Sequence, residues 1–223
     1  MKKKDLLKIT HETYLITLEG HFEFFPGQFC MVYVDSFGLT RKPLTLGMYK
    51  KDIAISVKIT GKGTKYIVET KQSLDVLAPC GNRFEPNGKN GVAIVAPSCF
   101  AEGYFISKTF NVPLYVTSKT PFDEGFLKVF EGENIEFVVG DENFLKVLKK
   151  VSSSYFDWIF VSGSKVMERI AIEILDKRLT YVSLNEYMGC GIGACKSCAI
   201  KTESGIKHVC TDGPVFRGNE ICL

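Results

Sequence analysis

The chain has 223 residues, 45% of them hydrophobic, so it can bury a substantial core and form two small domains or one domain with an appendage. Disorder is not expected. The formal net charge of +3, from 28 basic and 25 acidic side chains, is nearly balanced and gives no electrostatic reason to expect nucleic acid or an anionic membrane as a partner.

The N-terminal residues do not predict export. Lys8, Thr10, His11 and Glu12 interrupt the apolar positions that a signal peptide would need. No stretch reaches the roughly 18 apolar residues that span a bilayer. We therefore expect a soluble, cytoplasmic protein, and disulfides are a poor explanation for eight cysteines in that reducing compartment.

Residues 1–87 read as antiparallel strands. Apolar and polar residues alternate at Ile53, Ile55, Val57 and Ile59, as in a strand with one buried face. Turn residues such as Pro26-Gly27 separate these segments at the spacing of a small barrel or sandwich. The first domain is therefore predicted to be a β barrel.

Residues 88–180 change to strands that alternate with helices. Continuous apolar runs at 92–96, 114–116, 135–139 and 158–161 predict strands buried on both faces. Helices are predicted at 143–151 and 165–175. This order indicates an α/β domain with a parallel sheet.

Residues 181–223 form a Gly- and Cys-rich segment of about 40 residues, which is too small to be stable on core burial alone and would need a metal to hold it together. The segment contains Cys190, Cys195, Cys198 and Cys210, in the pattern C-x4-C-x2-C-x11-C. The other four cysteines, Cys30, Cys80, Cys99 and Cys222, are scattered and are interpreted as small buried hydrophobic residues.

The spacing of the first three clustered cysteines is that of plant-type [2Fe-2S] ligands, and thiolates suit this soft centre. Glycines at 189, 191 and 193 allow the loop to wrap closely and to direct N–H groups at sulfur. The alternative is a four-cysteine zinc site, which usually has two short-spaced cysteine pairs. This chain has only one x2 pair, so the pattern favours iron-sulfur.

The segment from Met188 to Phe216, with its ending CTDGPVF, closely resembles the electron-transfer subunits of class 1B dihydroorotate dehydrogenases. This resemblance implies a ferredoxin-reductase-type FAD barrel at 1–87, an NAD-binding-like α/β domain at 88–180 and a [2Fe-2S] domain at 181–223. It also implies a hetero-oligomer with an FMN-containing catalytic subunit.

The resemblance extends to the flavin motifs of the first domain. Residues 41–46 are similar to the family's Arg-Pro-x-Ser motif, with Lys42 in place of an arginine, which keeps the charge but loses the bidentate fork. Residues 56–58 and 61–64 resemble the second flavin segment. The FAD-binding residues implied in this way are Lys42, Pro43, Leu44, Thr45, Ser56, Val57, Lys58, Gly63 and Thr64.

The second domain departs from the family pattern at two places. The glycine-rich loop expected after its first strand reads Ala96-Pro97-Ser98-Cys99, and Pro97 has no N–H to offer an anion. The expected Cys-Gly-Pro reads Ser162-Gly163-Ser164, with Met167 retained. Nicotinamide binding is therefore left open.

Two hypotheses about function remain. In the first, FAD exchanges electron pairs with a small molecule and passes single electrons to the cluster. In the second, the chain is an adaptor that exchanges electrons only with proteins. A zinc-stapled structural protein is a third option. No residue stands out as a catalytic proton donor, and His208, close to Cys210, is a candidate for tuning the cluster.

Overall fold

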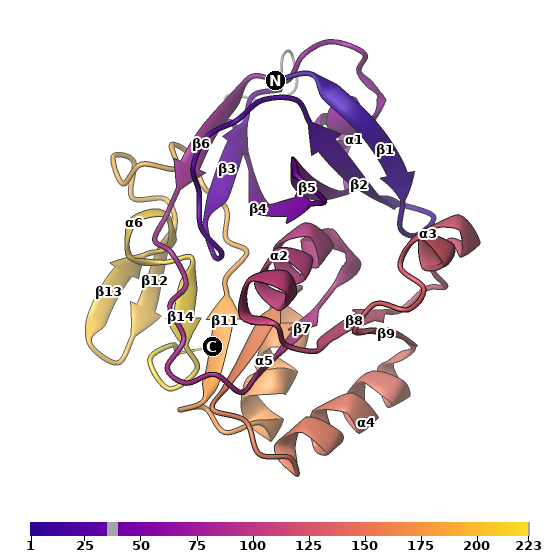
Figure 1. Cartoon of the computed structure of the whole chain (residues 1–223). Coiled ribbons are helices and arrows are strands. Elements are labelled where there is room, and N and C mark those ends of the chain that lie inside the picture. The colour runs from indigo at the N-terminus through magenta and orange to yellow at the C-terminus, as the bar shows by residue number, and fades with distance from the viewer. Residues whose placement is uncertain (35–39, 223) are drawn as a thin grey trace.

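The computed structural model describes residues 1–34 and 40–222. Figure 1 shows an antiparallel sheet above a mostly parallel sheet, with a small hairpin module at the side. None of the helices in the described ranges combines the length and apolar character needed to cross a membrane.

The first sheet is built from six antiparallel strands in the order β1-β2-β5-β4-β3-β6. Its elements are β1 (Lys3–Lys8), β2 (Thr13–Leu18), β3 (Phe29–Val32), β4 (Lys42–Tyr49), β5 (Asp52–Lys58), α1 (Lys62–Glu69) and β6 (Val76–Cys80). Ile53, Ile55 and Val57 are buried in the core of this sheet. Ala54 and Ser56 are buried too, so β5 is covered on both faces, whereas the alternation predicted one buried face.

The predicted β barrel is present in part, as an antiparallel sheet that the strand pairing does not close among the described residues. Among the described residues the sheet has two edges, β1 and β6, which do not pair with each other. The sheet curls until Met1 and Leu74 meet, where the Leu74 N–H donates to the Met1 carbonyl at 2.8 Å. The Met1 amino group in turn donates to the Leu74 carbonyl, so this pair of hydrogen bonds joins the residues that precede the two edge strands.

The second sheet has the order β14-β11-β10-β7-β8-β9, with β14 antiparallel to its neighbour and all other pairs parallel. Its strands are β7 (Gly91–Val95), β8 (Leu114–Ser118), β9 (Ile135–Val139), β10 (Trp158–Ser162), β11 (Thr180–Ser183) and β14 (Val215–Arg217). The connections contain η1 (Pro97–Cys99), α2 (Phe100–Phe110), α3 (Glu124–Val129), α4 (Asp141–Ser152) and α5 (Lys165–Ile174).

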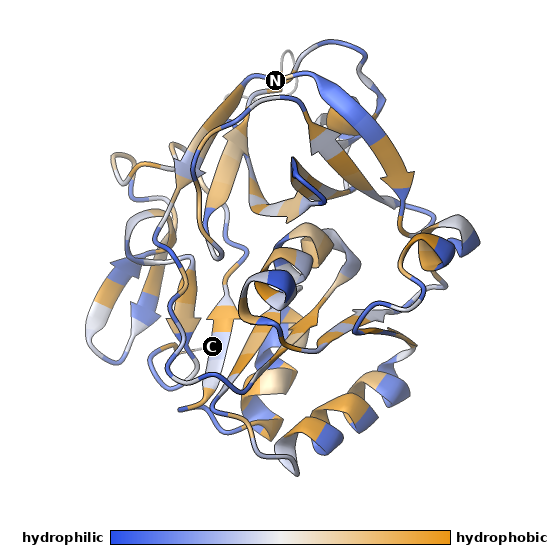
Figure 2. Cartoon of the chain, in the orientation of Figure 1, coloured by the Kyte–Doolittle hydropathy of each residue, from blue (hydrophilic) through white to orange (hydrophobic). Residues whose placement is uncertain are grey.

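Helices cover both faces of this parallel sheet. Val92 and Ile94 of β7 pack into one core with α4 and α5, whereas Ala93 and Val95 pack into a second core with α2 and α3. Figure 1 shows α2 between the two sheets. Figure 2 shows the strands as largely hydrophobic and α4 as striped, with a polar side towards solvent. The continuous apolar runs predicted strands buried on both faces, and the two cores confirm it.

The predicted helices at 143–151 and 165–175 are confirmed as α4 and α5, with ends shifted by up to two residues. The helices α1, α2 and α3 were not predicted. Helix α2 was missed because it is buried on most of its surface, so its sequence lacks a polar stripe.

The C-terminal module consists of β12 (Ala199–Thr202), β13 (Gly205–His208) and α6 (Val209–Asp212). It attaches to the antiparallel sheet through Asn82, whose side-chain amide donates to the Thr211 carbonyl at 2.9 Å. The chain then continues into β14, which pairs with β11, so the end of the cysteine-rich segment adds a strand to the α/β sheet.

Phe84 fixes the connection between the two sheets. It follows β6, is only 4% exposed, and lies with its ring centroid 5.5 Å from that of Trp158 and 5.1 Å from that of Phe160. Tyr181 adds a third ring at 5.2 Å. Edge-to-face contacts of this kind stabilise aromatic clusters beyond their burial.

We expect Phe84→Ala to lower the free energy of unfolding by about 3–5 kcal/mol, because it removes a buried ring and leaves a cavity. Denaturant titration measures this loss. The matched control is Ile206→Ala, since Ile206 is 74% exposed, and it should stay within about 0.5 kcal/mol of the parent. Equal midpoints for the two variants would contradict the assigned role of Phe84.

Candidate functional site

The clustered cysteines lie on two segments of the C-terminal module. Cys190, Cys195 and Cys198 belong to the loop between β11 and β12, and Cys210 lies in α6. The sulfurs of Cys198 and Cys210 are 3.3 Å apart, and both residues are buried. Cys190 is half-buried and Cys195 is exposed, and the Cys195 N–H donates to Cys190 Sγ at 3.4 Å.

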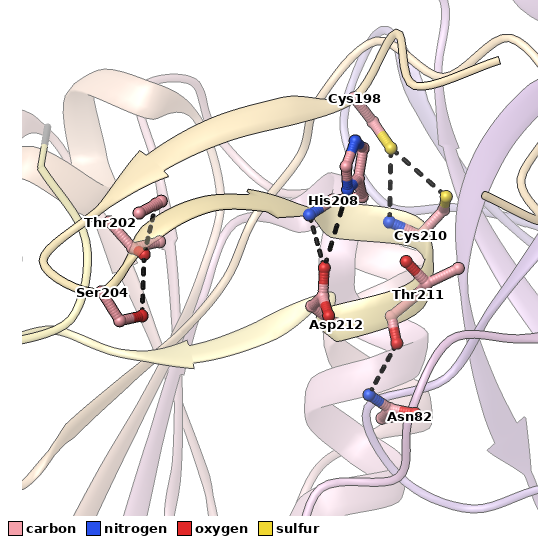
Figure 3. A network of polar contacts seen from close by, with 9 residues as sticks. Asn82, Cys198, Thr202, Ser204, His208, Cys210, Thr211 and Asp212 are labelled. Atoms are coloured by element: carbon pink, nitrogen blue, oxygen red, sulfur yellow. Dashed lines mark hydrogen bonds and ion pairs between the residues drawn. The ribbon is translucent and has the colours of Figure 1, made fainter. Parts of the chain in front are cut away.

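The structure therefore arranges the four cysteines as two pairs, Cys190 with Cys195 and Cys198 with Cys210. Figure 3 shows Cys198 and Cys210 facing each other, with the Cys210 N–H directed at Cys198 Sγ at 3.5 Å. In the described part of the chain, no group of three or more His, Cys, Asp or Glu side chains is arranged to hold a metal ion. Four thiols, two of which accept backbone N–H groups, are a donor set that suits an iron-sulfur centre.

Two glycines let the cysteine loop pack closely against its surroundings. Gly191 and Gly193 have φ values of +74° and +83°, a region that favours glycine. A Cβ on Gly191 would lie 2.5 Å from Cγ of Met31, and one on Gly193 would lie 2.7 Å from Cγ2 of Thr211. The loop thus lies against β3 on one side and α6 on the other, with no room for larger residues.

Cys195 and Cys210, one from each pair, differ in how easily they ionise. The Ser197 hydroxyl lies 3.2 Å from Cys195 Sγ, and together with the Ser197 N–H and Cys190 it lowers the pKa of Cys195 to about 6. Burial raises the pKa of Cys210 to about 11, and the Cys198 thiol adds to that rise. Cys195 is therefore more readily ionised than Cys210, and the thiolate is the form that binds metals.

His208 lies next to this site but its partner is Asp212. The His208 N–H donates to Asp212 Oδ2 at 2.6 Å, and its Nδ1 is 3.9 Å from the same oxygen. Figure 3 shows the carboxylate against both groups. The proposal that His208 tunes the cluster by hydrogen bonding remains a prediction.

A large cavity of ≈ 1570 Å³ runs from the antiparallel sheet to the carboxyl ends of the parallel strands. Eight of the nine residues implied to bind FAD line it: Lys42, Pro43, Leu44, Thr45, Ser56, Lys58, Gly63 and Thr64. Val57 is fully buried and lies in the core of the antiparallel sheet. The two sequence segments that predicted the flavin site thus meet at one cavity.

Two threonine hydroxyls at this cavity are buried without a hydrogen-bond partner. Thr45 Oγ1 and Thr10 Oγ1 have no hydrogen-bond partner among the described residues, and the two residues are only 8% and 1% exposed. A buried hydroxyl without a partner is costly, so a polar ligand group at this place would satisfy it. Thr10 was not predicted as a site residue, since one threonine near a turn carries no sequence signal.

The start of α1 forms a polar corner of the cavity. Thr64 Oγ1 accepts hydrogen bonds from the N–H groups of Thr60 and Gly61, at 2.9 and 3.2 Å. A Cβ on Gly63 would lie 3.1 Å from Cε of Lys42, so the glycine makes space for this lysine. Among the described residues no carboxylate pairs with Lys42, and an ammonium beside the first turn of a helix suits a phosphate group.

Ser56 has a structural role that the sequence did not indicate. Its Oγ accepts the Ala101 N–H at 2.9 Å, so this β5 side chain caps the first turn of α2. The expected nucleotide positions 96–99, Gly163, Ser164 and Met167 line the far end of the same cavity.

Behind that end lie two buried carboxyl groups that the sequence analysis missed. Glu102 accepts hydrogen bonds from Ser162 and Ser183, both at 2.8 Å, and burial raises its pKa to about 7. Glu168 is 0% exposed, and burial raises its pKa to about 8. The signal for Glu102 was available, because it is a single charge inside the largely apolar run from Cys99 to Ile106.

The fold and the site define the class as a two-sheet protein with a large cavity between the sheets and a cysteine-rich segment beside it. A family model described as the iron-sulfur cluster binding domain of dihydroorotate dehydrogenase B matches residues 185–222. Relatives with the name dihydroorotate dehydrogenase B (NAD(+)), electron transfer subunit, occur in Thermotoga petrophila and Clostridium acetobutylicum. The Thermotoga petrophila relative is 44% identical over 100% of this chain and 97% of its own length. The Clostridium acetobutylicum relative is 27% identical over 97% of this chain and 94% of its own length.

The chain belongs to the family of dihydroorotate dehydrogenase B electron transfer subunits. Among solved structures, that of an NADH-dependent reduced ferredoxin-NADP oxidoreductase aligns with a TM-score of 0.83 at 23% identity, covering 99% of this chain and 89% of the other. The cytochrome P450 reductase GcoB of Amycolatopsis aligns with a TM-score of 0.63 at 16% identity, covering 81% and 67%. Both similarities confirm the ferredoxin-reductase-like fold.

We expect Glu168→Gln to change how stability depends on pH. In the folded chain Glu168 keeps its proton up to about pH 8, whereas its ordinary pKa is 4.5. Between these values the unfolded chain releases the proton first, so the parent loses stability as the pH rises. The variant does not titrate, and its stability relative to the parent should rise by roughly 1–3 kcal/mol from pH 5 to pH 8.

Denaturant unfolding at a series of pH values measures this difference. Glu173→Gln is the matched control, because Glu173 lies on the same helix but is exposed. A parallel pH dependence in the parent and in Glu168→Gln would show that Glu168 does not titrate as proposed.

Proposed function

We propose that this chain is the electron-transfer subunit of a two-component oxidoreductase. FAD is held at the antiparallel sheet by the eight cavity-lining residues from Lys42 to Thr64 named above, with Val57 supporting them from the core. A [2Fe-2S] cluster is held by Cys190, Cys195, Cys198 and Cys210. FAD supplies chemistry that couples electron pairs to single electrons.

The observation that carries this proposal is the contact between the two sites. Gly191 of the cysteine loop lies against Met31 of β3, and Met31 is the strand partner of Pro43 in β4. Only one strand therefore separates the cysteine loop from the segment that carries Lys42 and Thr45. Met188, two residues before Cys190, lines the cavity itself.

The residues that line the cavity and those of the cysteine loop each have a defined role in the proposal. Lys42 and the first turn of α1 neutralise the phosphates, and Thr45 and Thr10 offer hydroxyls to a polar ring. The glycines of the cysteine loop keep the two centres close, and N–H groups at Cys190 and Cys198 sulfurs stabilise negative charge there.

The expected partner is a catalytic subunit that resembles FMN-containing dihydroorotate dehydrogenase, in a hetero-oligomer. Exposed apolar side chains near the cysteines support a docking role: Tyr187 is 89% and Ile192 is 63% exposed. The exposed Cys195 lies in the same loop. Electrons would then pass from the partner through the cluster to FAD.

We also propose the domain limits 1–87, 88–180 and 181–223 for the flavin, nucleotide-type and cluster parts, residues 35–39 and 223 lying outside the described residues. A cytoplasmic location belongs to the same proposal, because eight unpaired cysteines suit a reducing compartment.

An anaerobic absorbance spectrum tests the proposal as a whole. Purified protein should show flavin and iron-sulfur bands that bleach with dithionite, with one flavin and two irons per chain. A colourless protein that contains zinc would overturn it in favour of a structural role.

Cys198→Ser should abolish iron and acid-labile sulfide while leaving the chain folded, because Cys198 supplies one of four ligands. Cys222→Ser is the matched control, since Cys222 is exposed and lies outside the two pairs. Iron analysis and circular dichroism give the two readouts. Equal iron content in both variants would remove Cys198 from the ligand set.

Lys42→Ala should weaken FAD binding by roughly tenfold, because it removes a cation that contacts phosphate. Fluorescence titration of the apoprotein with FAD measures the dissociation constant. Lys51→Ala is the control, because Lys51 is exposed and does not line the cavity. Identical dissociation constants for the two variants would place the phosphates elsewhere.

A further inference from the structure

The far end of the cavity lies where a parallel sheet of this order normally binds a nucleotide. The strand order β9-β8-β7-β10-β11 reverses direction along the chain between β7 and β10. Ligands of open α/β sheets bind at the carboxyl ends of the strands at such a point. Here those ends are the turn 96–99 after β7 and residues 163–165 after β10, which all line the cavity.

The turn after β7 has already used the N–H groups that a pyrophosphate needs. Pro97 has none. The Cys99 N–H donates to the Ala96 carbonyl at 2.9 Å, and the Phe100 N–H donates to the Pro97 carbonyl. The Ala101 N–H donates to Ser56 Oγ. In the described residues of this turn, only the Ser98 N–H remains without a partner, whereas anion sites at helix starts use several such donors.

The start of α2 also has no freedom to move away and release these groups. A Cβ on Gly47 of β4 would lie 1.9 Å from the Ala101 carbonyl oxygen, so the helix start rests directly on the antiparallel sheet. Ser56 of β5 holds it from the neighbouring strand. Any shift of the turn would break a contact between the two sheets.

The charges at this end are unfavourable for a dianion as well. Lys165, at the start of α5, is paired with Glu186 at 2.7 Å, and Lys119, after β8, is paired with Asp141 at 3.4 Å. The carboxyl groups of Glu102 and Glu168 lie buried in the first turns of α2 and α5. Burial raises the pKa of Glu102 to about 7 and that of Glu168 to about 8, so these side chains add no positive charge to either helix start, and the paired lysines remain the main charges at this end.

The flavin end of the same cavity differs from the nucleotide end in its charges and in its hydrogen-bonding groups. Lys42 and Lys62 line it, and neither is within 4.0 Å of a carboxylate among the described residues. Its hydroxyls at Thr10 and Thr45 still lack partners. In the part of the chain that the structure describes, one cavity therefore has an end with unpaired lysines and hydroxyls that suit a phosphate-bearing ligand, and an end where the turn after β7 keeps one unpaired N–H and the lysines are paired with carboxylates.

We infer that this chain holds no nicotinamide dinucleotide at the carboxyl ends of β7 and β10, so that NADH and NADPH are not redox partners of its flavin. The inference rests on the proposed function and narrows the class of its redox partners. It separates this chain from those relatives whose names include NAD(+). No hydride is then exchanged with a nicotinamide dinucleotide at this end of the cavity.

Equilibrium dialysis of the flavin-loaded protein against NAD⁺ and ADP-ribose tests the binding step without any turnover. We expect no saturable binding up to ~1 mM, the upper end of ordinary KM values. The relative from Clostridium acetobutylicum is the positive control in the same cell. Saturable binding of either probe to this chain below ~1 mM would overturn the inference.

Anaerobic mixing with NADH or NADPH provides the second readout. Dithionite should bleach the flavin and iron-sulfur bands, whereas ~1 mM of either dinucleotide should leave them unchanged over minutes. Bleaching by a dinucleotide would overturn the inference while leaving the proposed function intact. Protein without flavin and iron would instead overturn the proposed function, and the dialysis result would still report on the pocket.

Discussion

The first turn of α2, clamped between the two sheets, is the constraint on which the rest of the arrangement depends. Gly47 lets β4 approach the Ala101 carbonyl, and Ser56 of β5 accepts the N–H of the same residue. One residue is thereby fixed by two neighbouring strands of the other sheet. Because α2 starts directly after β7, this contact sets where the parallel sheet sits relative to the flavin-type cavity.

The same clamp links stability with function. Hydrogen bonds that hold a helix start cannot also hold a ligand, since each N–H donates to one main acceptor. In this chain the bond from Ala101 to Ser56 joins the sheets and at the same time removes a phosphate donor from the nucleotide end. The buried Glu102, bound by Ser162 and Ser183, fills the space behind it. A rigid interface between the sheets is the result, and the flavin end keeps the donors.

Much of the architecture could be predicted from the sequence because the signals were local. The x4 and x2 spacing of the cysteines and the apolar runs of the parallel strands need only neighbouring residues to be recognised. The open edge between β1 and β6 could not be predicted, since it depends on how far the sheet curls and on the contact of Met1 with Leu74. Helix α2 lacks a polar face, so it shows no periodic signal.

Only those residues of the candidate site that belong to contiguous sequence motifs could be predicted. Lys42 and Thr45 sit in a contiguous motif, whereas Thr10, Glu102 and Glu168 acquire their roles only through partners far along the chain. The loss of the glycine-rich loop at 96–99 could be seen in the sequence as a departure from the family pattern. The hydrogen-bond acceptors of the N–H groups around that turn could not be predicted, because one of them, Ser56, lies 45 residues from its donor.

The pairing of β14 with β11 has a consequence for the metal-free state. Ser183 and Val215 are strand partners, so the intervening residues leave the sheet and return to it at adjacent points. The cysteine-rich segment is therefore a loop whose two ends are both held in the sheet. The pairing of β11 with β14 already offsets the conformational entropy cost of bringing these ends together. Cluster assembly can then take place on an otherwise folded subunit, as a late maturation step whose failure leaves the scaffold intact.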